Sequence, residues 1–281
     1  MQIIREIDAL RRAVAEIRED GGTLALVPTM GALHAGHMAL VAEAQRYADH
    51  VAASIFVNPT QFGANEDFSR YPRQEAEDAA KLRAAGCALL WAPSVAVMYP
   101  AGHATSIRVS GVSETLEGAY RPGHFDGVAT VVAKLFGQVQ PDVALFGEKD
   151  FQQLAVIRKM VRDLDLAVRI VGVPTQRDAD GVALSSRNAY LSEEERVAAR
   201  TLPRALLEAA QAMRDGEAAG DVLERARAQL RAAGFDPIDY VALADAETLA
   251  PVEGLARPAR LLAAAKLGRT RLIDNLAVEP L

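Results

Sequence analysis

Apolar and amphipathic segments alternate along the first two thirds of the chain. A run from Thr23 to Val27 has the unbroken apolar character of a strand that a parallel sheet buries on both faces. A turn containing Pro and Gly follows it, and the segment from His37 to Tyr47 then has the pattern of a helix. This stretch therefore predicts a strand, a loop and a helix in succession.

The same alternation predicts the other elements before position 175. Apolar residues from Ile3 to Ile17 recur with a helical period and predict a first helix. Further strands are predicted at 51–57, 87–92, 105–109, 142–146 and 167–173, and further helices at 73–85, 127–139 and 151–164. Strands that alternate with helices of this length predict an α/β fold with a doubly wound, Rossmann-like parallel sheet and right-handed crossovers.

The character of the sequence changes after about Asn188. Helices rich in Ala, Glu and Arg are predicted at 192–216 and 221–234, and Pro203 should kink or split the first of them. Short strand-like runs follow at 238–243, 260–266 and 271–278. We therefore expect two domains, a sheet domain at 1–175 and a smaller α+β domain at 176–281, with a hinge at about 175–188.

Composition narrows the classes of function. Half of the 281 residues are apolar, which is enough for a sizeable core, and the net charge of −6 without a basic run argues against a nucleic-acid partner. A single cysteine, Cys87, excludes an internal disulfide and suggests a reducing compartment, so the cytoplasm is expected. No apolar run approaches the roughly 20 residues that cross a membrane. A small-molecule ligand is the expectation that remains.

Two histidines stand three residues apart after the first predicted buried strand, in the string His-Ala-Gly-His at 34–37. In a first helical turn both imidazoles can face one point, where the N-terminus of the helix favours an anion such as phosphate. Gly36 lets a ligand approach the main chain. The alternative is that one histidine lies at the surface and the other caps the helix. The strand before the pair and the helix after it favour the phosphate interpretation.

Ligands of parallel sheets bind beyond the C-terminal ends of the strands, where three further polar clusters occur. FVNPTQFG at 56–63 places Asn58 and Gln61 after the second strand, and amide side chains suit a ligand that carries hydroxyls beside a carboxylate. An ordinary Asn-Pro turn explains the same string equally well.

The other two clusters contain charged side chains. In FGEKDFQQL at 146–154, Lys149 supplies a point charge for phosphate, Asp150 can cap the next helix or bind a ribose hydroxyl, and Gln153 follows one turn later. In DGVALSSRN at 180–188, two hydroxyls and the Arg187 guanidinium can surround a polyphosphate. A plain serine-rich loop remains an alternative for the last string.

The string PTMGALHAGH at 28–37 resembles the HxGH region of the nucleotidylyltransferase superfamily, and the pantothenate synthetase family in particular. The three clusters above and LEGAYRPGHFDGV at 116–128 also match that family, so the resemblance extends from Pro28 to Asn188. It implies ATP-dependent condensation of pantoate with β-alanine through a pantoyl-adenylate, with release of AMP and pyrophosphate. It also implies a homodimer, Mg²⁺ carried with the nucleotide phosphates, and a C-terminal domain that acts as a lid over the intermediate.

The resemblance also implies roles for individual residues. His34, His37 and Lys149 are implied to be catalytic, Asn58, Gln61 and Gln153 to bind pantoate, and Gln61 to bind β-alanine as well. The residues implied to bind ATP are Met30, Gly31, Ala32, Leu33, His34, Ala35, Gly36, His37, Gly147, Glu148, Lys149, Asp150, Gln176, Leu184, Ser185, Ser186 and Arg187. At Gln176 the family usually has an aliphatic residue and uses its main chain. The resemblance assigns no protein ligand to the metal.

Two other functions share parts of this pattern. An adenylyltransferase that stops after nucleotidyl transfer would also carry HxGH and SSRN, but FVNPTQF and GEKDFQQL argue against it. A nucleotide-binding regulatory module would have no need for the complete set of histidines, lysine and serines. The sequence therefore favours the two-step ligase.

Overall fold

The computed structural model describes residues 1–63 and 66–280. They divide into two compact units, which we describe separately. The first unit contains residues 1–110, 121–148 and 156–174, and the second contains 111–120, 149–155 and the chain from 175 onward. Two short segments from the first two thirds of the sequence therefore group with the C-terminal third. The boundary predicted at 175 and the lid role of the C-terminal domain stay predictions.

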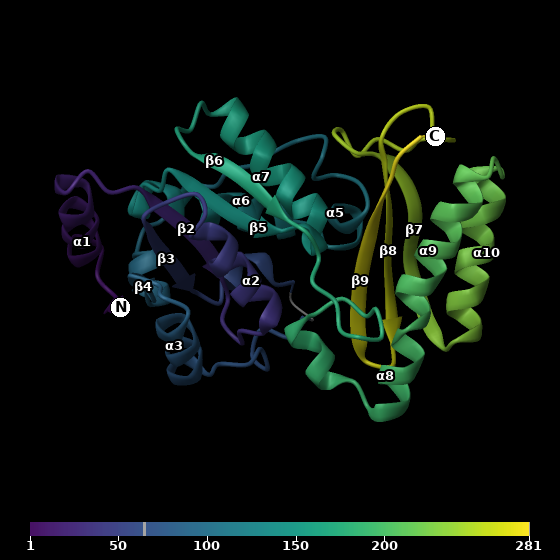
Figure 1. Cartoon of the computed structure of the whole chain (residues 1–281), viewed down its shortest axis with the longest axis horizontal. Helices are drawn as coiled ribbons and strands as arrows, with labels where there is room; N and C mark the ends of the chain where they lie inside the picture. Colours follow the sequence, from purple (N-terminus) through teal and green to yellow (C-terminus); the bar gives the residue numbers. More distant parts are fainter. Residues whose placement is uncertain (64–65, 281) are drawn as a thin grey trace. The chain divides into compact units, whose positions relative to one another are not determined.

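The described part of the first unit contains one sheet of six strands (Figure 1). All neighbouring strands run parallel. In spatial order they are β1 (Gln2–Ile4), β4 (Leu89–Trp91), β3 (His50–Ile55), β2 (Leu24–Thr29), β5 (Val143–Gly147) and β6 (Arg169–Val173). The prediction of a doubly wound parallel sheet is confirmed. The order reverses between β2 and β5, and ligands of such sheets bind beyond the strand ends at this switch point.

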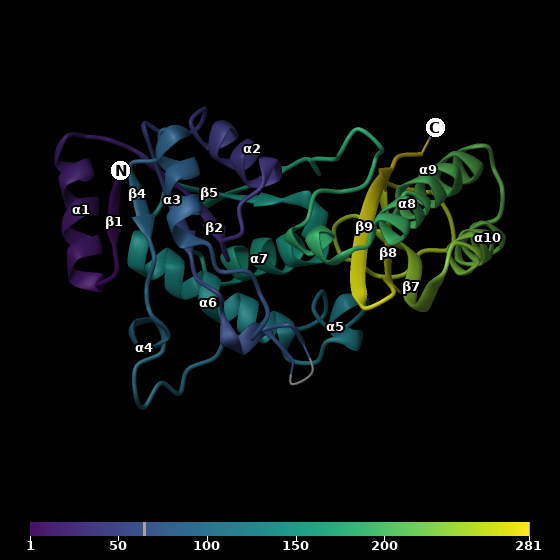
Figure 2. The same cartoon turned by 90° about the horizontal axis from the view of Figure 1, so that it is seen from below.

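Helices cover both faces of this sheet. Figure 2 shows α2 (Ala35–Ala44) and α3 (Glu75–Ala84) on one face, and α6 (His124–Val139) on the other. Helix α1 (Ile7–Glu19) packs against α6. The central strand is fully buried from Leu24 to Val27, as its apolar run predicts. The short α4 (Val95–Met98) and a 3-10 turn at Pro59–Gln61 also belong to this unit, and α7 (Phe151–Asp163) follows β5 along the chain.

The structure corrects two predictions in this unit. Residues 2–4 form strand β1 and not the start of the first helix, because their main chain pairs with β4 at the sheet edge and the β-branched side chain of Ile4 is buried there. The strand predicted at 105–109 is absent from the described residues. The main-chain N–H of Ile107 instead donates to the hydroxyl of Thr130 on α6, at 2.9 Å. A segment with the alternating pattern of a strand does not form one unless a neighbouring strand offers main-chain hydrogen bonds.

The second unit contains an antiparallel sheet with β7 (Phe235–Asp245), β8 (Ala259–Leu267) and β9 (Thr270–Val278) in that order. Helices α9 (Thr201–Arg214) and α10 (Ala219–Ala232) pack on one of its faces. Pro203 splits the long helix as predicted, because α8 (Glu193–Ala199) ends before it and it occupies the first turn of α9. The prediction of a smaller α+β part toward the C-terminus is thus confirmed. No helix in the described residues is long and apolar enough to span a membrane.

The second face of this sheet is covered by the two short segments that join the unit. Leu262 on β8 packs in a small cluster with Phe151 at the start of α7. The next residue, Gln152, is buried and its amide makes three hydrogen bonds to the segment 111–120, which contains α5 (Glu117–Tyr120). Its Nε2 donates to the carbonyls of Val112 and Thr115, both at 2.8 Å, and its Oε1 accepts from the N–H of Glu117 at 2.9 Å.

We predict that Gln152→Ala destabilises the protein by about 2–4 kcal/mol, because three main-chain groups lose their partner in a buried place. Chemical denaturation followed by far-UV circular dichroism measures this. Gln211→Ala is the matched control, since the amide of Gln211 is exposed on α9 and bonds to Asp215 in the next turn. Equal, small shifts in the two variants would show that the amide of Gln152 does not hold segment 111–120.

Candidate active site

The segment after β2 turns sharply before it enters α2. Gly31 and Ala32 both have left-handed main-chain conformations, with φ of 85° and 52°. The hydroxyl of Thr29 accepts from the N–H of Gly31 at 3.1 Å and donates to the carbonyl of Ser54 at 2.7 Å. The N–H groups of Ala32 and Leu33 donate to the buried carboxylate of Asp78. Any contact of Ala32 or Leu33 with ATP therefore has to use other atoms.

The histidine pair caps helix α2. Nδ1 of His34 accepts from the N–H of Gly36 at 3.1 Å, Nδ1 of His37 accepts from the N–H of His34 at 3.3 Å, and the two ring centroids lie 4.1 Å apart. The capping alternative considered for one histidine thus applies to both rings. A neutral ring that accepts at Nδ1 carries its proton on Nε2. Each neutral imidazole therefore offers Nε2–H as a donor, so capping does not exclude binding of phosphate.

Asn58 is buried, and its amide organises the turn that carries Gln61. Its Oδ1 accepts from the hydroxyls of Thr60, at 2.9 Å, and Tyr99, at 2.8 Å. Its Nδ2 donates to Oε1 of Gln61 at 3.0 Å and to the carbonyl of Gly127 at 3.1 Å. This turn touches α6 so closely that a Cβ on Gly127 would lie 2.4 Å from the carbonyl oxygen of Thr60. Asn58 orients Gln61, and its predicted contact with pantoate stays a prediction.

The Gln61 side chain points its Nε2 toward the sulfur of Met30, at 3.4 Å. The main-chain carbonyl of Gln61 lies 2.7 Å from Nδ1 of His124. Nε2 of the same histidine lies 3.1 Å from the Arg121 guanidinium. Arg121 donates from Nε to Glu66 at 2.7 Å. Burial alone would raise the pKa of Glu66, but the hydrogen bond and charge of Arg121 outweigh it and lower that pKa. Burial of Tyr99 raises the pKa of its phenol, although hydrogen bonds to Thr60 and Asn58 oppose the shift.

The segment after β5 forms a 3-10 turn at Glu148–Asp150 that leads into α7. The carbonyl of Lys149 accepts from Nδ2 of the buried Asn275 on β9 at 2.8 Å. Oδ1 of Asn275 accepts from Nε of Arg260 at 2.7 Å, and the Arg260 guanidinium lies over the ring of Phe151 at 4.0 Å. The main chain at Lys149 is thus fixed by side chains of the second sheet. Asp150 is exposed, and Gln153, one turn further along, is half-buried.

The loop with Ser185 and Ser186 follows a short hairpin in the second unit, in which Arg177 pairs with Ala183. The N–H of Leu184 donates to the carbonyl of Gln176 at 2.9 Å, and Ser185 caps a 3-10 helix at Ser186–Tyr190 by accepting from the N–H of Arg187 at 3.3 Å. Arg177 binds the buried Asp274 of β9 with both Nη atoms, at 2.7 and 2.8 Å. The hydrogen bond and charge of Asp274 raise the pKa of Arg177 despite its partial burial.

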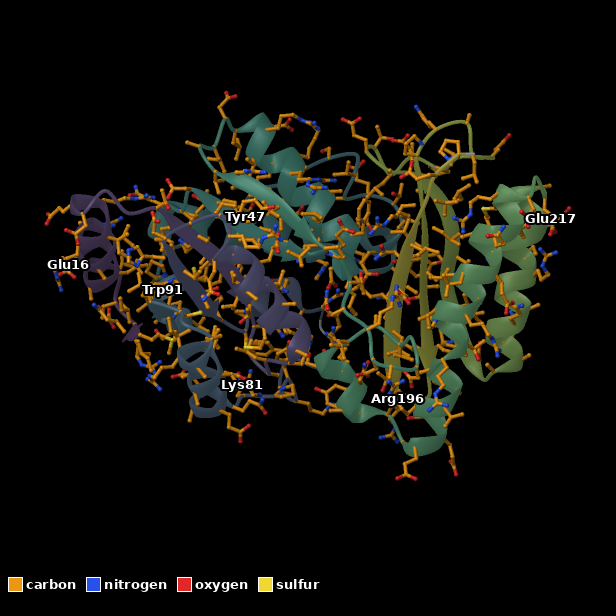
Figure 3. All side chains as sticks on the ribbon, in the orientation of Figure 1. Glu16, Tyr47, Lys81, Trp91, Arg196 and Glu217 are labelled. Atoms are coloured by element: carbon orange, nitrogen blue, oxygen red, sulfur yellow. The ribbon has the colours of Figure 1, made fainter. Side chains whose placement is uncertain are left out.

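A second arginine binds the same hairpin through two carboxylates. Arg196, labelled on α8 in Figure 3, donates to Asp178 at 2.7 Å and to Asp180 at 3.0 Å. The hairpin is therefore fixed both to β9 and to α8, within one unit.

Known proteins with similar sequences and structures identify the family. The family model described as pantoate-beta-alanine ligase matches residues 2–277. A pantothenate synthetase of Rhizorhabdus wittichii is 67% identical over 280 residues, which cover 100% of this chain and 99% of the relative. The crystal structure of pantothenate synthetase from Thermus thermophilus matches with a TM-score of 0.94 at 49% identity, covering 100% of both chains. The chain belongs to the pantoate-beta-alanine ligase family.

Membership in the pantoate-beta-alanine ligase family makes the chain a ligase of pantothenate biosynthesis. A further family member, from Francisella tularensis, was solved in complex with beta-gamma ATP and beta-alanine. It matches with a TM-score of 0.82 at 32% identity over 98% of this chain and 97% of that one. The resemblance drawn from the sequence motifs is thereby confirmed for the family, and the roles of individual residues stay predictions.

Within the first unit, the structure brings together several residues that the sequence resemblance implied. The loop at Met30–His37 and the turn with Asn58 and Gln61 meet through the contact between Gln61 and Met30. Gly147 is the last residue of β5, the strand beside β2, and Glu148 follows it. Lys149, Asp150, Gln153, Gln176 and Leu184–Arg187 belong to the second unit. Among the described residues, no three or more His, Cys, Asp or Glu side chains converge where they could hold a metal ion.

Sequence reasoning missed Tyr99, Glu66 and Asp78 as supports of these loops. Tyr99 and Asp78 lie 41 and 46 residues from the groups they bind, and Glu66 lies 55 residues from Arg121. The string LEGAYRPGHFDGV contains Arg121, but nothing in that string indicates Glu66 as its partner. Such long-range pairs leave no local signal in a single sequence.

The lowered pKa of Glu66 predicts a pH dependence. Because its folded pKa lies below the unfolded value, the ion pair stabilises the protein above the unfolded pKa and this contribution is lost as pH falls through the folded pKa. We predict that Arg121→Met costs about 1–2 kcal/mol of unfolding free energy at pH 7. The difference from wild type should shrink as pH falls toward 3.

Urea denaturation of both proteins between pH 7 and pH 3 measures this difference. Arg204→Met is the control, because Arg204 is exposed on α9 and lies 3.8 Å from Glu208. A difference for Arg121→Met that stays constant over the range would contradict the role of Glu66.

Proposed function

We propose that the chain ligates pantoate to β-alanine in an ATP-dependent reaction with two steps. In the first, the pantoate carboxylate attacks the α-phosphorus of ATP and pyrophosphate leaves. In the second, the neutral amine of β-alanine attacks the carbonyl carbon of the acyl-adenylate, and AMP leaves as the amide bond forms. The observation that carries this proposal is the histidine pair at the start of α2, whose neutral rings offer two Nε2–H donors beyond the end of a switch-point strand.

The first step needs donors and alignment more than it needs a base. A carboxylate with an ordinary pKa near 4 is ionised at neutral pH, so no group has to remove a proton from it. The protein instead has to hold two anions in line and stabilise charge on the phosphoryl oxygens. Imidazole Nε2–H groups, the Lys149 ammonium and the Arg187 guanidinium are donors suited to that task. His34, His37 and Lys149 are the residues we propose as catalytic.

The proposed ligand contacts follow the family resemblance. We propose that ATP contacts the loop at Met30–His37, the turn at Gly147–Asp150, Gln176 and the loop at Leu184–Arg187. Asn58, Gln61 and Gln153 contact pantoate, and Gln61 also contacts β-alanine. The bond from Asn58 to Oε1 of Gln61 supports a defined orientation of that amide. The complex solved for the Francisella tularensis relative supports ATP and β-alanine as substrates.

Three broader features are part of the same proposal. We propose that Mg²⁺ arrives with the nucleotide phosphates, since this ion prefers phosphate and carboxylate oxygens as ligands. We also propose a cytoplasmic homodimer. A single cysteine allows no internal disulfide, which supports a reducing compartment. Burial raises the pKa of the Cys87 thiol to about 11, so this thiol stays protonated at neutral pH.

We predict that His37→Ala lowers turnover on the order of 100-fold or more, because it removes one preorganised donor to the phosphoryl oxygens. The affinity for ATP should fall much less, since the bond strengthens in the transition state. Steady-state kinetics and calorimetric titration with ATP measure the two effects. His50→Ala is the control, as His50 lies at the first residue of β3, at the opposite end of that strand from the candidate site, and no sequence motif includes it. Near-native turnover of His37→Ala would assign the ring to capping alone.

The order of the two steps makes a second prediction. With ATP, Mg²⁺ and pantoate but without β-alanine, the enzyme should exchange labelled pyrophosphate into ATP, because the first step is reversible while the adenylate stays bound. Omission of pantoate should abolish the exchange. Release of ADP would indicate phosphoryl transfer instead, and exchange that ignores pantoate would indicate a nucleotidyltransferase. No exchange in protein that binds both ligands would overturn the adenylate mechanism.

A further inference from the structure

The carboxylate of Asp78 occupies an anion-binding turn of its own chain. Asp78 lies in the first half of α3, and its side chain is 1% exposed. Oδ2 accepts from the N–H of Ala32 and Oδ1 from the N–H of Leu33, both at 2.8 Å. Successive main-chain N–H groups in a turn of this kind form a concave site that binds anions, and phosphate is a frequent occupant. Here an internal carboxylate fills the site.

The main-chain conformation of the turn at 31–33 requires a stabilising partner such as the Asp78 carboxylate. Ala32 has a φ of 52°, which residues with a Cβ adopt infrequently and keep only where their surroundings determine it. Gly31 precedes it with a φ of 85°. A Cβ on Gly31 would lie 3.1 Å from Oδ2 of Asp78 and 3.2 Å from Cγ2 of Ile55, so a side chain at that position would crowd the carboxylate. The turn and the carboxylate therefore fit each other closely.

Helix α3 supplies a second contact to the same turn. Nζ of Lys81, which is labelled on α3 in Figure 3, donates to the carbonyl of Leu33 at 2.8 Å. It lies 3.9 Å from Oδ1 of Asp78. Side chains of α3 thus bind three main-chain groups of the turn, which are the N–H of Ala32 and the N–H and carbonyl of Leu33. The next residue is His34, whose ring caps α2.

We propose that Asp78, assisted by Lys81, is a positioning residue for the histidine pair. The carboxylate fixes the turn at 31–33, and the turn fixes where His34 begins α2 and where both Nε2 atoms lie. The N–H groups of Ala32 and Leu33 serve this turn and do not take a substrate phosphate. The catalytic consequence rests on the proposed function, whereas the effect on the turn does not.

The variant Asp78→Asn tests the proposal with little change of shape. One amide oxygen can still accept, but the NH₂ group then faces a main-chain N–H and leaves that bond unmade. We expect kcat for pantoate-dependent pyrophosphate exchange to fall about 10- to 100-fold, since small displacements of reacting groups have effects of this size. The KM for β-alanine in the complete reaction should stay within about threefold of wild type, because a displaced histidine pair acts on the phosphoryl step.

Two further variants keep the test decisive. Glu77→Gln removes the same charge from the neighbouring exposed position of α3 and should leave kcat within about twofold of wild type. Lys81→Met removes the bond to Leu33 without burying a new polar group. Lys81→Met should lower kcat about 3- to 10-fold. If Asp78→Asn fails to fold, this variant replaces it as the test of the proposal. Native turnover in folded Asp78→Asn, or an equal loss in Glu77→Gln, would overturn the proposal.

Amide hydrogen exchange measured by NMR gives a result that does not depend on activity. In Asp78→Asn the amides of Ala32 and Leu33 should exchange at least about tenfold faster, while the amide of Leu26 inside β2 keeps its protection. Unchanged protection of Ala32 and Leu33 would overturn the proposal even if turnover fell. If wild type showed no pyrophosphate exchange but the variant opened the turn, the positioning role would stand and the adenylate mechanism would fall.

Discussion

Main-chain groups that leave a buried strand need new hydrogen-bond partners, and this requirement shapes every loop of the candidate site. After β2 the partners are the hydroxyl of Thr29, the carboxylate of Asp78 and the ammonium of Lys81. Beyond β3 Asn58 holds its own turn, and beyond β5 Asn275 holds the carbonyl of Lys149. Because polar side chains supply these partners, the loops have defined conformations without belonging to a helix or a strand. A rigid loop of this kind is what a reaction that depends on alignment requires.

The sheet and its helices could be predicted because their signals are local. The run at 23–27 is apolar and becomes the fully buried β2, and the split at Pro203 follows from a single residue type. The errors arose where a distant partner decides. Residues 2–4 form a strand because β4 offers an edge, and 105–109 form none because no neighbouring strand pairs with them in the described structure.

The candidate site could be proposed at the level of motifs but not at the level of atoms. The histidine pair, Gln61 and Lys149 were selected as candidates because each follows a strand and matches a family string. The sequence did not reveal that Asn58 uses its amide inside its own turn and on Gly127, or that Gln152, and not its neighbour Gln153, is the buried amide of α7. These differences depend on which way a side chain points, and that is settled by packing partners far along the chain.

The two functions considered for the histidines, capping and binding of phosphate, use different atoms of the same rings. Capping uses Nδ1 of both residues, and this fixes the neutral tautomer with its proton on Nε2. A neutral imidazole in that tautomer can donate a hydrogen bond from Nε2–H without first taking up a second proton. The first step of the proposed reaction needs hydrogen-bond donors and not a base, since its nucleophile is already ionised. The bonds that begin helix α2 therefore also select the form of the imidazoles that the proposed reaction requires.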